Sequence, residues 1–172
     1  MTHISQSLSH LDIAEVNLSD NALGRKGIVA CKSLLSSRPA LRKLWLENNG
    51  LSAEACREVA DLLLGSEGPS ARLPLHTLHF YNNMSGDGGG ENVARIVACS
   101  PELQDFRLGS TRCLEKGGEA IGRALCACRK LRKLNVADNT FKVKGGKAIA
   151  NAVKSMPDLR TLYLGDNSFD VE

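Results

Sequence analysis

The sequence has little of what marks several large classes of protein. In 172 residues it has 4% aromatic residues, five prolines and four histidines, and its net charge is only +3. No apolar run reaches the roughly 20 residues that span a bilayer, and the first residues lack a secretion-signal profile. The basic residues are scattered without a dense run, whereas a nucleic-acid footprint needs clustered charge. We therefore expect a soluble, cytoplasmic protein with no transmembrane segment and no nucleic-acid partner.

Residues that carry chemistry are also sparse. Zinc sites usually present two separated Cys or His pairs, whereas Cys126-Ala-Cys128 stands alone and no His follows it. A free thiol otherwise behaves as a small hydrophobe, so we expect the cysteines to pack in the core. The Gly-rich segments at 86–91 and 144–148 lack the Lys-Ser/Thr pair of a phosphate loop. We expect no metal, no cofactor and no catalytic turnover by this chain.

What the sequence does have is one nine-residue pattern, LxxLxLxxN, in six copies. The copies are IAEVNLSDN, LRKLWLENN, LHTLHFYNN, LQDFRLGST, LRKLNVADN and LRTLYLGDN, and they end at Asn21, Asn49, Asn83, Thr111, Asn139 and Asn167. These last residues are separated by 28, 34, 28, 28 and 28 positions. Such an interval is typical of leucine-rich repeats.

Each copy predicts one short strand. The fourth and sixth positions are apolar and point the same way in a strand, while the fifth points to the opposite face. The final Asn can satisfy backbone groups in the turn after the strand, so we expect these amides to stack into a ladder. Thr111 has one hydroxyl in place of an amide and should interrupt that ladder.

Helical stretches follow the strands, because the apolar residues there recur at intervals of three and four. They lie at 24–39, 52–66, 88–101, 115–130 and 144–157. The predicted fold class is α/β: a leucine-rich-repeat solenoid, or horseshoe, with a parallel concave sheet and convex helices. We expect a single domain over 1–172 with about six repeats. Residues 1–12 align with the tail of a preceding helix and 170–172 stop where another should begin, so we expect truncation at both ends.

One irregularity interrupts the spacing. The interval between the second and third copies has six extra residues, which fall in the Gly-, Pro- and Ser-rich segment 65–74. This composition predicts a surface loop at the end of a helix. The segment is either a partner-contacting loop or a tolerated insertion.

The outward-facing strand positions carry side chains that favour protein contacts. The fifth positions are Asn17, Trp45, His79, Arg107, Asn135 and Tyr163, and the seventh are Ser19, Glu47, Tyr81, Gly109, Ala137 and Gly165. Trp, Tyr and Arg are enriched at interface hot spots. We expect His79 to be exposed and Trp45 to contact a partner; alternatively, His79 and Lys43 cover the Trp45 ring.

A polar rim should follow the strands. It consists of the eighth positions Asp20, Asn48, Asn82, Ser110, Asp138 and Asp166. Three Asp and two Asn along one edge would form an acidic, hydrogen-bonding surface suited to a basic patch on a partner.

Some segments are more specific than the repeat. They are VNLSDNALG, LRKLWLENNGLS, LHTLHFYNNMSGDGGGENVARIV, SPELQDFRLGSTR with GGEAIGRAL after it, and LRKLNVADNTF with GGKAIANAV after it. Together they closely resemble the Ran GTPase-activating protein family, whose repeats are of the ribonuclease-inhibitor-like type, over essentially the whole chain. The resemblance implies a protein that stimulates GTP hydrolysis by the small GTPase Ran in nucleocytoplasmic transport. It also implies anchoring at the nuclear envelope through parts outside this chain.

The resemblance further implies which residues act. In the family, an Asn within an NNG segment helps to orient the catalytic glutamine of Ran, and LENNGL places that role on Asn48. An amide can hold a glutamine or a water through paired hydrogen bonds without adding charge. The expected partner is a Ran-type GTPase in its GTP form, which brings its own GTP and Mg. The expected contact residues are Asp20, Trp45, Glu47, His79, Tyr81, Asn82, Arg107 and Asp138.

The sequence also departs from the family pattern. Family members have more repeats, and the repeat before VNLSDNALG supplies an Arg-bearing loop that this chain does not contain. The alternative interpretation is a generic leucine-rich-repeat module that binds a protein and activates no GTPase.

Overall fold

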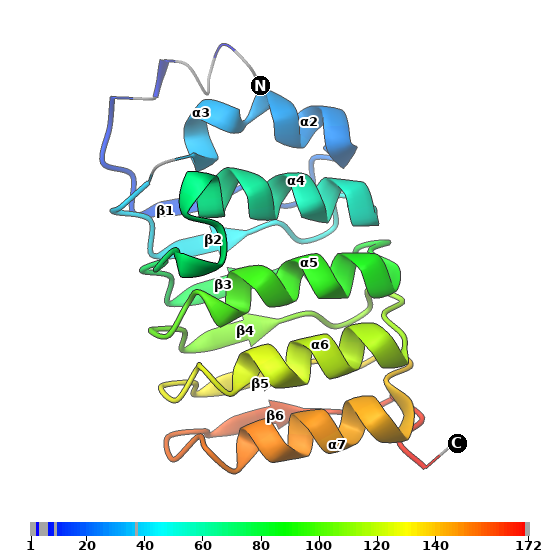
Figure 1. Cartoon of the computed structure of the whole chain (residues 1–172). Coiled ribbons are helices and arrows are strands. Elements are labelled where there is room, and N and C mark those ends of the chain that lie inside the picture. The colour runs from blue at the N-terminus through cyan, green and yellow to red at the C-terminus, as the bar shows by residue number, and fades with distance from the viewer. Residues whose placement is uncertain (1–2, 4–6, 9, 37, 171–172) are drawn as a thin grey trace.

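The computed structural model describes residues 3, 7–8, 10–36 and 38–170, which form two stacked layers (Figure 1). The strands are β1 (Glu15–Asn17), β2 (Lys43–Trp45), β3 (Thr77–His79), β4 (Asp105–Arg107), β5 (Lys133–Asn135) and β6 (Thr161–Tyr163). The helices are α2 (Gly24–Ala30), α3 (Lys32–Leu35), α4 (Ala53–Leu64), α5 (Gly86–Ala98), α6 (Glu115–Leu125) and α7 (Lys142–Val153), with the 3-10 helix η1 (Gly65–Ser70) after α4. The expectation for residues 1–12 falls largely outside the described ranges, as do residues 171–172.

The six strands form one parallel sheet in the order β1-β2-β3-β4-β5-β6. Equivalent positions of neighbouring repeats are paired, so Val16 lies beside Leu44 and Leu44 beside Leu78. The helices cover the other face, as Figure 1 shows. The predicted α/β leucine-rich-repeat fold, with a concave sheet and convex helices, is therefore confirmed.

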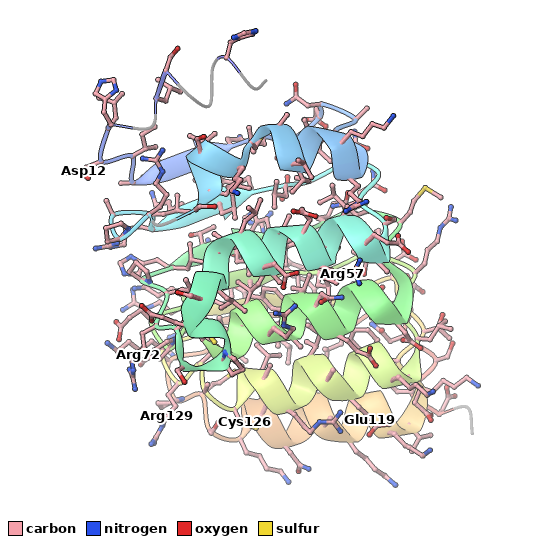
Figure 2. The ribbon with its side chains drawn as sticks, turned by 45° about the horizontal axis from the view of Figure 1, so that its top comes forward. Asp12, Arg57, Arg72, Glu119, Cys126 and Arg129 are labelled. Carbon is pink, nitrogen blue, oxygen red and sulfur yellow. The ribbon has the colours of Figure 1, made fainter. Side chains whose placement is uncertain are left out.

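The core lies between the two layers. The fourth and sixth strand positions point into it, and Leu44, Leu46, Phe80 and Phe106 are fully buried. Burying such a side chain contributes about 1.5–3 kcal/mol, so each repeat adds substantially to stability. Leu162 of the last strand is 41% exposed, because no further strand covers it among the described residues. Charged residues of the helices, such as Arg57, lie on the outer face (Figure 2).

The asparagine ladder is present. Oδ1 of Asn83 accepts hydrogen bonds from the N–H groups of Asn49 (3.1 Å) and Leu51 (3.0 Å) in the preceding repeat. Its Nδ2 donates to the carbonyls of Leu46 (2.9 Å) and Phe80 (2.8 Å). One buried side chain thus satisfies backbone groups in two repeats, which favours stacking over separation of the repeats.

Thr111 interrupts the ladder, as predicted. Its hydroxyl lies 3.1 Å from the Leu108 carbonyl and 2.9 Å from Oδ1 of Asn139, in its own repeat and the following one. In the described part of the chain, its side chain makes no hydrogen bond back to the repeat of Asn83. The side chain of Asn83 accepts hydrogen bonds from the backbone of the second repeat, but the side chain of Thr111 accepts none from the backbone of the third repeat within the described residues.

The extra residues between the second and third repeats form η1 and the segment 71–74 after it, in which Ala71 is buried and Arg72 is exposed. Sγ of Cys99 approaches the carbonyls of Gly68 (3.9 Å) and Pro69 (3.6 Å). The Leu73 N–H donates to the Cys99 carbonyl at 2.7 Å. The insertion therefore packs against the end of α5, and the strand register on either side is unchanged.

Candidate functional site

The eighth-position column is the first part of the candidate site. It consists of Asp20, Asn48, Asn82, Ser110, Asp138 and Asp166, which directly follow the strands and all have a positive φ, between 50° and 62°. Asn and Asp adopt this left-handed conformation more readily than other non-glycine residues. It turns the chain sharply away from the sheet, and every side chain of the column except the half-buried Ser110 is exposed.

Hydrogen bonds tie part of this column together. Nδ2 of Asn48 donates to Oδ1 of Asp20 at 2.9 Å, and Oδ1 of Asn48 accepts from Nδ2 of Asn82 at 3.1 Å. Farther along, the Ser110 hydroxyl donates to Oδ2 of Asp138 at 2.8 Å. The Asn48 amide is therefore held between its two neighbours with a defined orientation.

The backbone fixes the column as well. The Asp20 N–H donates to the Glu47 carbonyl and the Asn48 N–H to the Tyr81 carbonyl, both at 3.0 Å. The N–H of Asn82 makes the equivalent bond to Gly109 at 3.0 Å. Ser110 and Asp138 make the same kind of bond, so every residue of the column before Asp166 is attached to the next repeat. A partner would therefore meet a surface that needs little ordering on binding.

The second part of the site is a charged cluster on the sheet around His79. Nδ1 of His79 lies 3.0 Å from Oε1 of Glu47, and Nε2 lies 3.1 Å from Oδ1 of Asp105. The His79 ring meets the Trp45 ring edge to face, with centroids 6.0 Å apart. The side chain of Arg107 reaches Asp105 at 3.4 Å. Five residues from three neighbouring repeats therefore form one network, which we call the His79 cluster (Trp45, Glu47, His79, Asp105 and Arg107).

The expectation that His79 is exposed was wrong, because only 4% of its surface is accessible. The ring lies between the carboxylates of Glu47 and Asp105, and its buried Nε2, although 3.1 Å from Oδ1 of Asp105, makes no well-aligned hydrogen bond in the described part of the chain. Trp45 is half-buried and its ring contacts His79, which agrees with the alternative that neighbours cover it in part. Among these residues, Glu47 and Arg107 offer the more accessible polar groups.

Asp105 is the most strongly held carboxylate of the cluster. Burial alone would raise its pKa, but the close approach and charge of His79, followed by those of Arg107, bring the pKa below its ordinary value. Asp105 therefore stays ionised at neutral pH and holds both His79 and Arg107 in place.

Apolar side chains adjoin the eighth-position column. Tyr81 is 40% exposed, and its ring lies so close to Gly109 that a Cβ there would meet the Tyr81 Cδ2 at 3.1 Å. Met84 is 56% exposed and Leu114 is 50% exposed. Leu114 also lines a hollow of about 380 Å³ that includes Asn82 and Asp138. Exposed apolar side chains beside fixed polar groups are typical of protein-binding surfaces.

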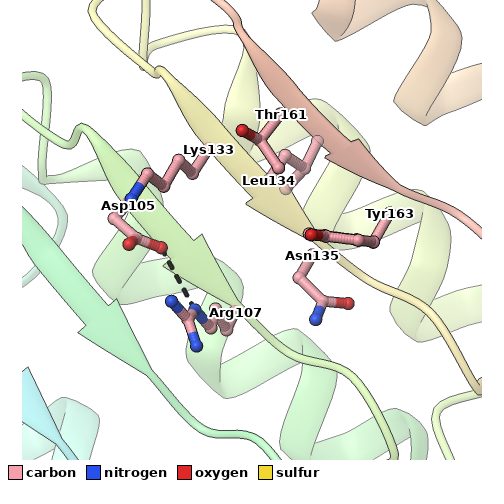
Figure 3. A pocket seen from close by; sticks show the side chains of 7 residues that line it. All are labelled: Asp105, Arg107, Lys133, Leu134, Asn135, Thr161 and Tyr163. Carbon is pink, nitrogen blue, oxygen red and sulfur yellow. Dashed lines mark hydrogen bonds and ion pairs between the residues drawn. The ribbon is translucent and has the colours of Figure 1, made fainter.

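A further hollow of about 350 Å³ lies on the sheet over β4, β5 and β6 (Figure 3). Lys133 of β5 reaches toward Asp105 of β4, while Asn135 and Tyr163 form the other side. Arg107 therefore belongs both to the His79 cluster and to this hollow. The hollow is polar and open, which suits contact with a protein surface better than enclosure of a small molecule.

The described residues contain no group of three or more His, Cys, Asp or Glu side chains able to hold a metal ion. Cys126 is exposed, but Cys128 is buried with Sγ 3.5 Å from the Val97 and Ser100 carbonyls. These two thiols therefore lie in different surroundings. In the same part of the chain, no helix has the length and apolar character needed to cross a lipid bilayer.

The structure brings most of the predicted contact residues together. Asp20, Asn48 and Asn82 form one hydrogen-bonded run, and Glu47 connects it to the His79 cluster because it precedes Asn48 in the chain. Asp138 lies apart, with Ser110 as its partner. Sequence reasoning missed Asp105, which holds His79 from the third position of the next repeat. The repeat pattern contained the information needed, because aligning the third and fourth repeats places Asp105 beside Thr77, which lies two residues before His79.

Comparison with known proteins agrees with this geometry. A family model described as "Leucine Rich repeat" matches residues 127–150, which run from the loop before β5 into α7. The chain is a leucine-rich-repeat array. It is similar to mouse NACHT, LRR and PYD domains-containing protein 12, with 36% identity over 78 residues, 45% of this chain and 7% of that protein. It is also similar to pig ribonuclease inhibitor, with 34% identity over 98 residues, 56% of this chain and 20% of the inhibitor.

A solved structure shows the same fold. Leiomodin-1 Actin-Binding Site 2 superposes with a TM-score of 0.60 at 16% sequence identity, covering 90% of this chain and 86% of that chain. The chain therefore has the architecture of a leucine-rich-repeat array, and its sequence is similar to parts of ribonuclease inhibitor and of a NACHT, LRR and PYD domains-containing protein. The array spans only a small part of the curated relatives named above. None of the proteins named here is a Ran GTPase-activating protein.

Proposed function

We propose that the array binds a Ran-type small GTPase in its GTP form and stimulates its GTP hydrolysis. The contact surface would be the eighth-position column together with the His79 cluster. The observation that carries the proposal is the state of Asn48, which is exposed, has a φ of 50° and is held on both sides by Asp20 and Asn82. The resemblance in LENNGL, NNMSGDGG and FRLGSTR supports the choice of partner.

Asn48 has free hydrogen-bonding capacity for such a role. Its Nδ2 has two hydrogens and Oδ1 has two lone pairs, of which Asp20 and Asn82 each use one. The remaining N–H and lone pair can form a paired contact with the side-chain amide of a partner glutamine. Because the amide is already oriented, the contact would position the glutamine at a low entropic cost.

The surrounding residues would supply affinity. Tyr81 and the exposed edge of Trp45 provide aromatic area, and Asp20 and Asp138 provide acidic groups toward a basic surface. Arg107 is half-exposed and anchored by Asp105, so it can contact a carboxylate of the partner. In this mechanism GTP and Mg belong to the GTPase, and the array adds only protein contacts. The corresponding location is the cytoplasm, with attachment to the nuclear envelope through other parts of the protein.

A second candidate is a module that binds another protein and activates no GTPase. The similar proteins favour it, because pig ribonuclease inhibitor is named for inhibition of an enzyme and the leiomodin-1 structure for a site that binds actin. In this case the same column and cluster would bind the partner, and Asn48 would be an ordinary contact residue.

Binding to Ran separates the two candidates. The array is titrated with Ran loaded with a non-hydrolysable GTP analogue or with GDP, and single-turnover GTP hydrolysis is followed in parallel. We expect preference for the GTP form and loss of at least about ten-fold in stimulation for Asn48→Ala. Asn151→Ala, which removes an exposed Asn from the outer face of α7, should leave both unchanged.

Two results would contradict the proposal. Equal affinity for both nucleotide forms would remove Ran from consideration and favour the second candidate. Full stimulation by Asn48→Ala would remove the role of Asn48 and leave Ran as the partner.

A further inference from the structure

Basic side chains collect along the edge of the sheet opposite the eighth-position column. The second position of each repeat, directly before the strand, holds Ala14, Arg42, His76, Gln104, Arg132 and Arg160. Backbone bonds align these positions, since the Arg42 carbonyl accepts the His76 N–H and the Arg132 carbonyl accepts the Arg160 N–H. Residues far apart in sequence thus form one row, with neighbours about 4.8 Å apart.

Two loop residues extend this row. Arg72 and Arg129 lie in the loops before β3 and β5, and Figure 2 shows both at the same edge of the molecule, away from the helical layer of Arg57. We call the set Arg42, Arg72, His76, Arg129, Arg132 and Arg160 the pre-strand ridge. The basic residues are scattered in the sequence, but pairing of the strands brings these six to one edge of the structure.

The ridge carries positive charge that the chain itself does not neutralise. Arg129 and Arg132 are exposed and make no ion pair or hydrogen bond within the described part of the chain. The acidic groups nearby are already used, since Glu102 pairs with Lys130 at 2.6 Å and Asp158 with Arg160 at 3.8 Å. The side chain of Arg42 donates to the Pro39 carbonyl at 2.7 Å, which leaves its charge unpaired.

Glu102 lies beside the ridge. Its pKa lies below its ordinary value chiefly because Lys130 donates a hydrogen bond to it; burial opposes this shift, and the positive charges of Lys130, His76 and Arg72 add to it. An exposed carboxylate on this edge is therefore stabilised in its charged form, as the carboxylate of a bound molecule would be.

We propose that the pre-strand ridge binds an extended acidic segment of another polypeptide. From Arg42 to Arg160 the row crosses four steps between strands, about 19 Å, which matches roughly six residues of extended chain. Arg pairs with carboxylates through two parallel hydrogen bonds, so the abundance of Arg over Lys favours carboxylates as ligands. This surface is separate from the eighth-position column, so both could be occupied at once.

A peptide fits the ridge better than a nucleic acid does. Single-stranded nucleic acids need aromatic side chains on which bases stack, and the ridge has none. The hollow of about 440 Å³ beside Arg72 is lined by Pro39, Leu63 and Pro74 together with Arg38 and Glu67, so its walls are partly apolar and partly polar.

Charge reversal tests the ridge. A fluorescent peptide of about ten glutamates is titrated with the whole array, and fluorescence anisotropy gives the affinity. We expect the R129E/R132E double variant to bind at least about ten-fold more weakly, and the neutral R129Q/R132Q variant to fall between it and wild type. Both positions are exposed and unpaired, so circular dichroism and the thermal midpoint should not change.

A matched control removes general charge effects. Arg57→Glu reverses the charge of an exposed Arg on the outer face of α4. We expect this variant to bind the glutamate peptide with the affinity of the wild type. The single variants R129E and R132E each reverse one charge, as Arg57→Glu does. If Arg57→Glu weakens peptide binding as much as either of them, the proposal is overturned. Unchanged peptide affinity of the R129E/R132E double variant would also overturn it. Tighter binding of a thymidine oligonucleotide of the same length would also overturn it, in favour of a nucleic-acid surface.

Discussion

Nδ1 of His79 lies 3.0 Å from Oε1 of Glu47, and the His79 ring contacts Trp45 of the same neighbouring repeat. A His at an outward-facing strand position is thereby buried, and its burial depends on partners from the repeats on both sides. The cluster therefore joins the second, third and fourth repeats on the sheet face, whereas the asparagine ladder joins only the second and third of these at the turns, because Thr111 interrupts it. The residues that we propose as partner contacts are therefore held by interactions between repeats.

Removing His79 should destabilise the array. His79→Ala would leave the carboxylates of Glu47 and Asp105 facing each other without the ring between them, and Trp45 would lose its contact. We expect a loss of about 2–3 kcal/mol in the free energy of unfolding, measured by urea titration. Tyr163→Ala, at the same position of β6 where the side chain is 56% exposed, should cost less than about 1 kcal/mol. Equal losses for the two variants would contradict the structural role of His79.

Acid should weaken the His79 cluster through Asp105. Its pKa is below the ordinary value, so ionised Asp105 contributes stability above about pH 4, and this contribution is lost as the pH falls through the lower pKa of the folded state. The difference in unfolding free energy between wild type and Asp105→Asn should be largest near neutral pH and shrink in acid. Urea titrations of both proteins at several pH values measure this difference. A constant difference across that range would show that Asp105 does not titrate as described.

Much of the array could be predicted, because side chains alternate between the two faces of a strand and the strands recur at a nearly fixed interval in the sequence. Together these two regularities decide which residues point inward. Leu44 and Phe106 are buried as the pattern requires, and Thr111 interrupts the ladder. The burial of His79 could not be predicted from its own repeat, since Asp105 and Glu47 belong to the neighbours. The same limit hid the pre-strand ridge, because Arg42 and Arg132 become members of one row only when the strands pair.

The ladder asparagines should differ in importance. Asn83→Ala removes bonds to the backbone of two repeats and leaves buried N–H and carbonyl groups unpaired, which should cost about 3 kcal/mol or more. Asn167 offers a matched comparison, because its buried Oδ1 has no partner in the described part of the chain. Asn167→Ala should therefore cost at least about 1 kcal/mol less. Urea unfolding of the two variants decides this, and the reverse order would refute the ladder as a source of stability.

The cysteines should react in a fixed order. Burial raises the pKa of Cys56 to about 11 and those of Cys113 and Cys128 to about 12, so their thiolate forms are rare. Cys126 is exposed and should be the first thiol that iodoacetamide modifies in the folded protein at about pH 8. Peptide mapping by mass spectrometry identifies the modified residue. Cys126→Ser should abolish the early reaction, whereas equally fast reaction of Cys128 would contradict its burial.

Restoring the interrupted rung should stabilise the array. In Thr111→Asn, the new side-chain oxygen could accept the N–H groups of Asn83 and Ser85, as Oδ1 of Asn83 accepts those of Asn49 and Leu51. We expect a gain of about 1 kcal/mol in the free energy of unfolding, because two buried N–H groups would acquire a partner. Thr111→Ala is the control and should lose stability, since it removes the bond to the Leu108 carbonyl. Thr111→Asn could instead lower the urea midpoint to that of the Ala variant. That result would show that the fourth repeat is adapted to the smaller side chain and that completing the ladder does not stabilise it.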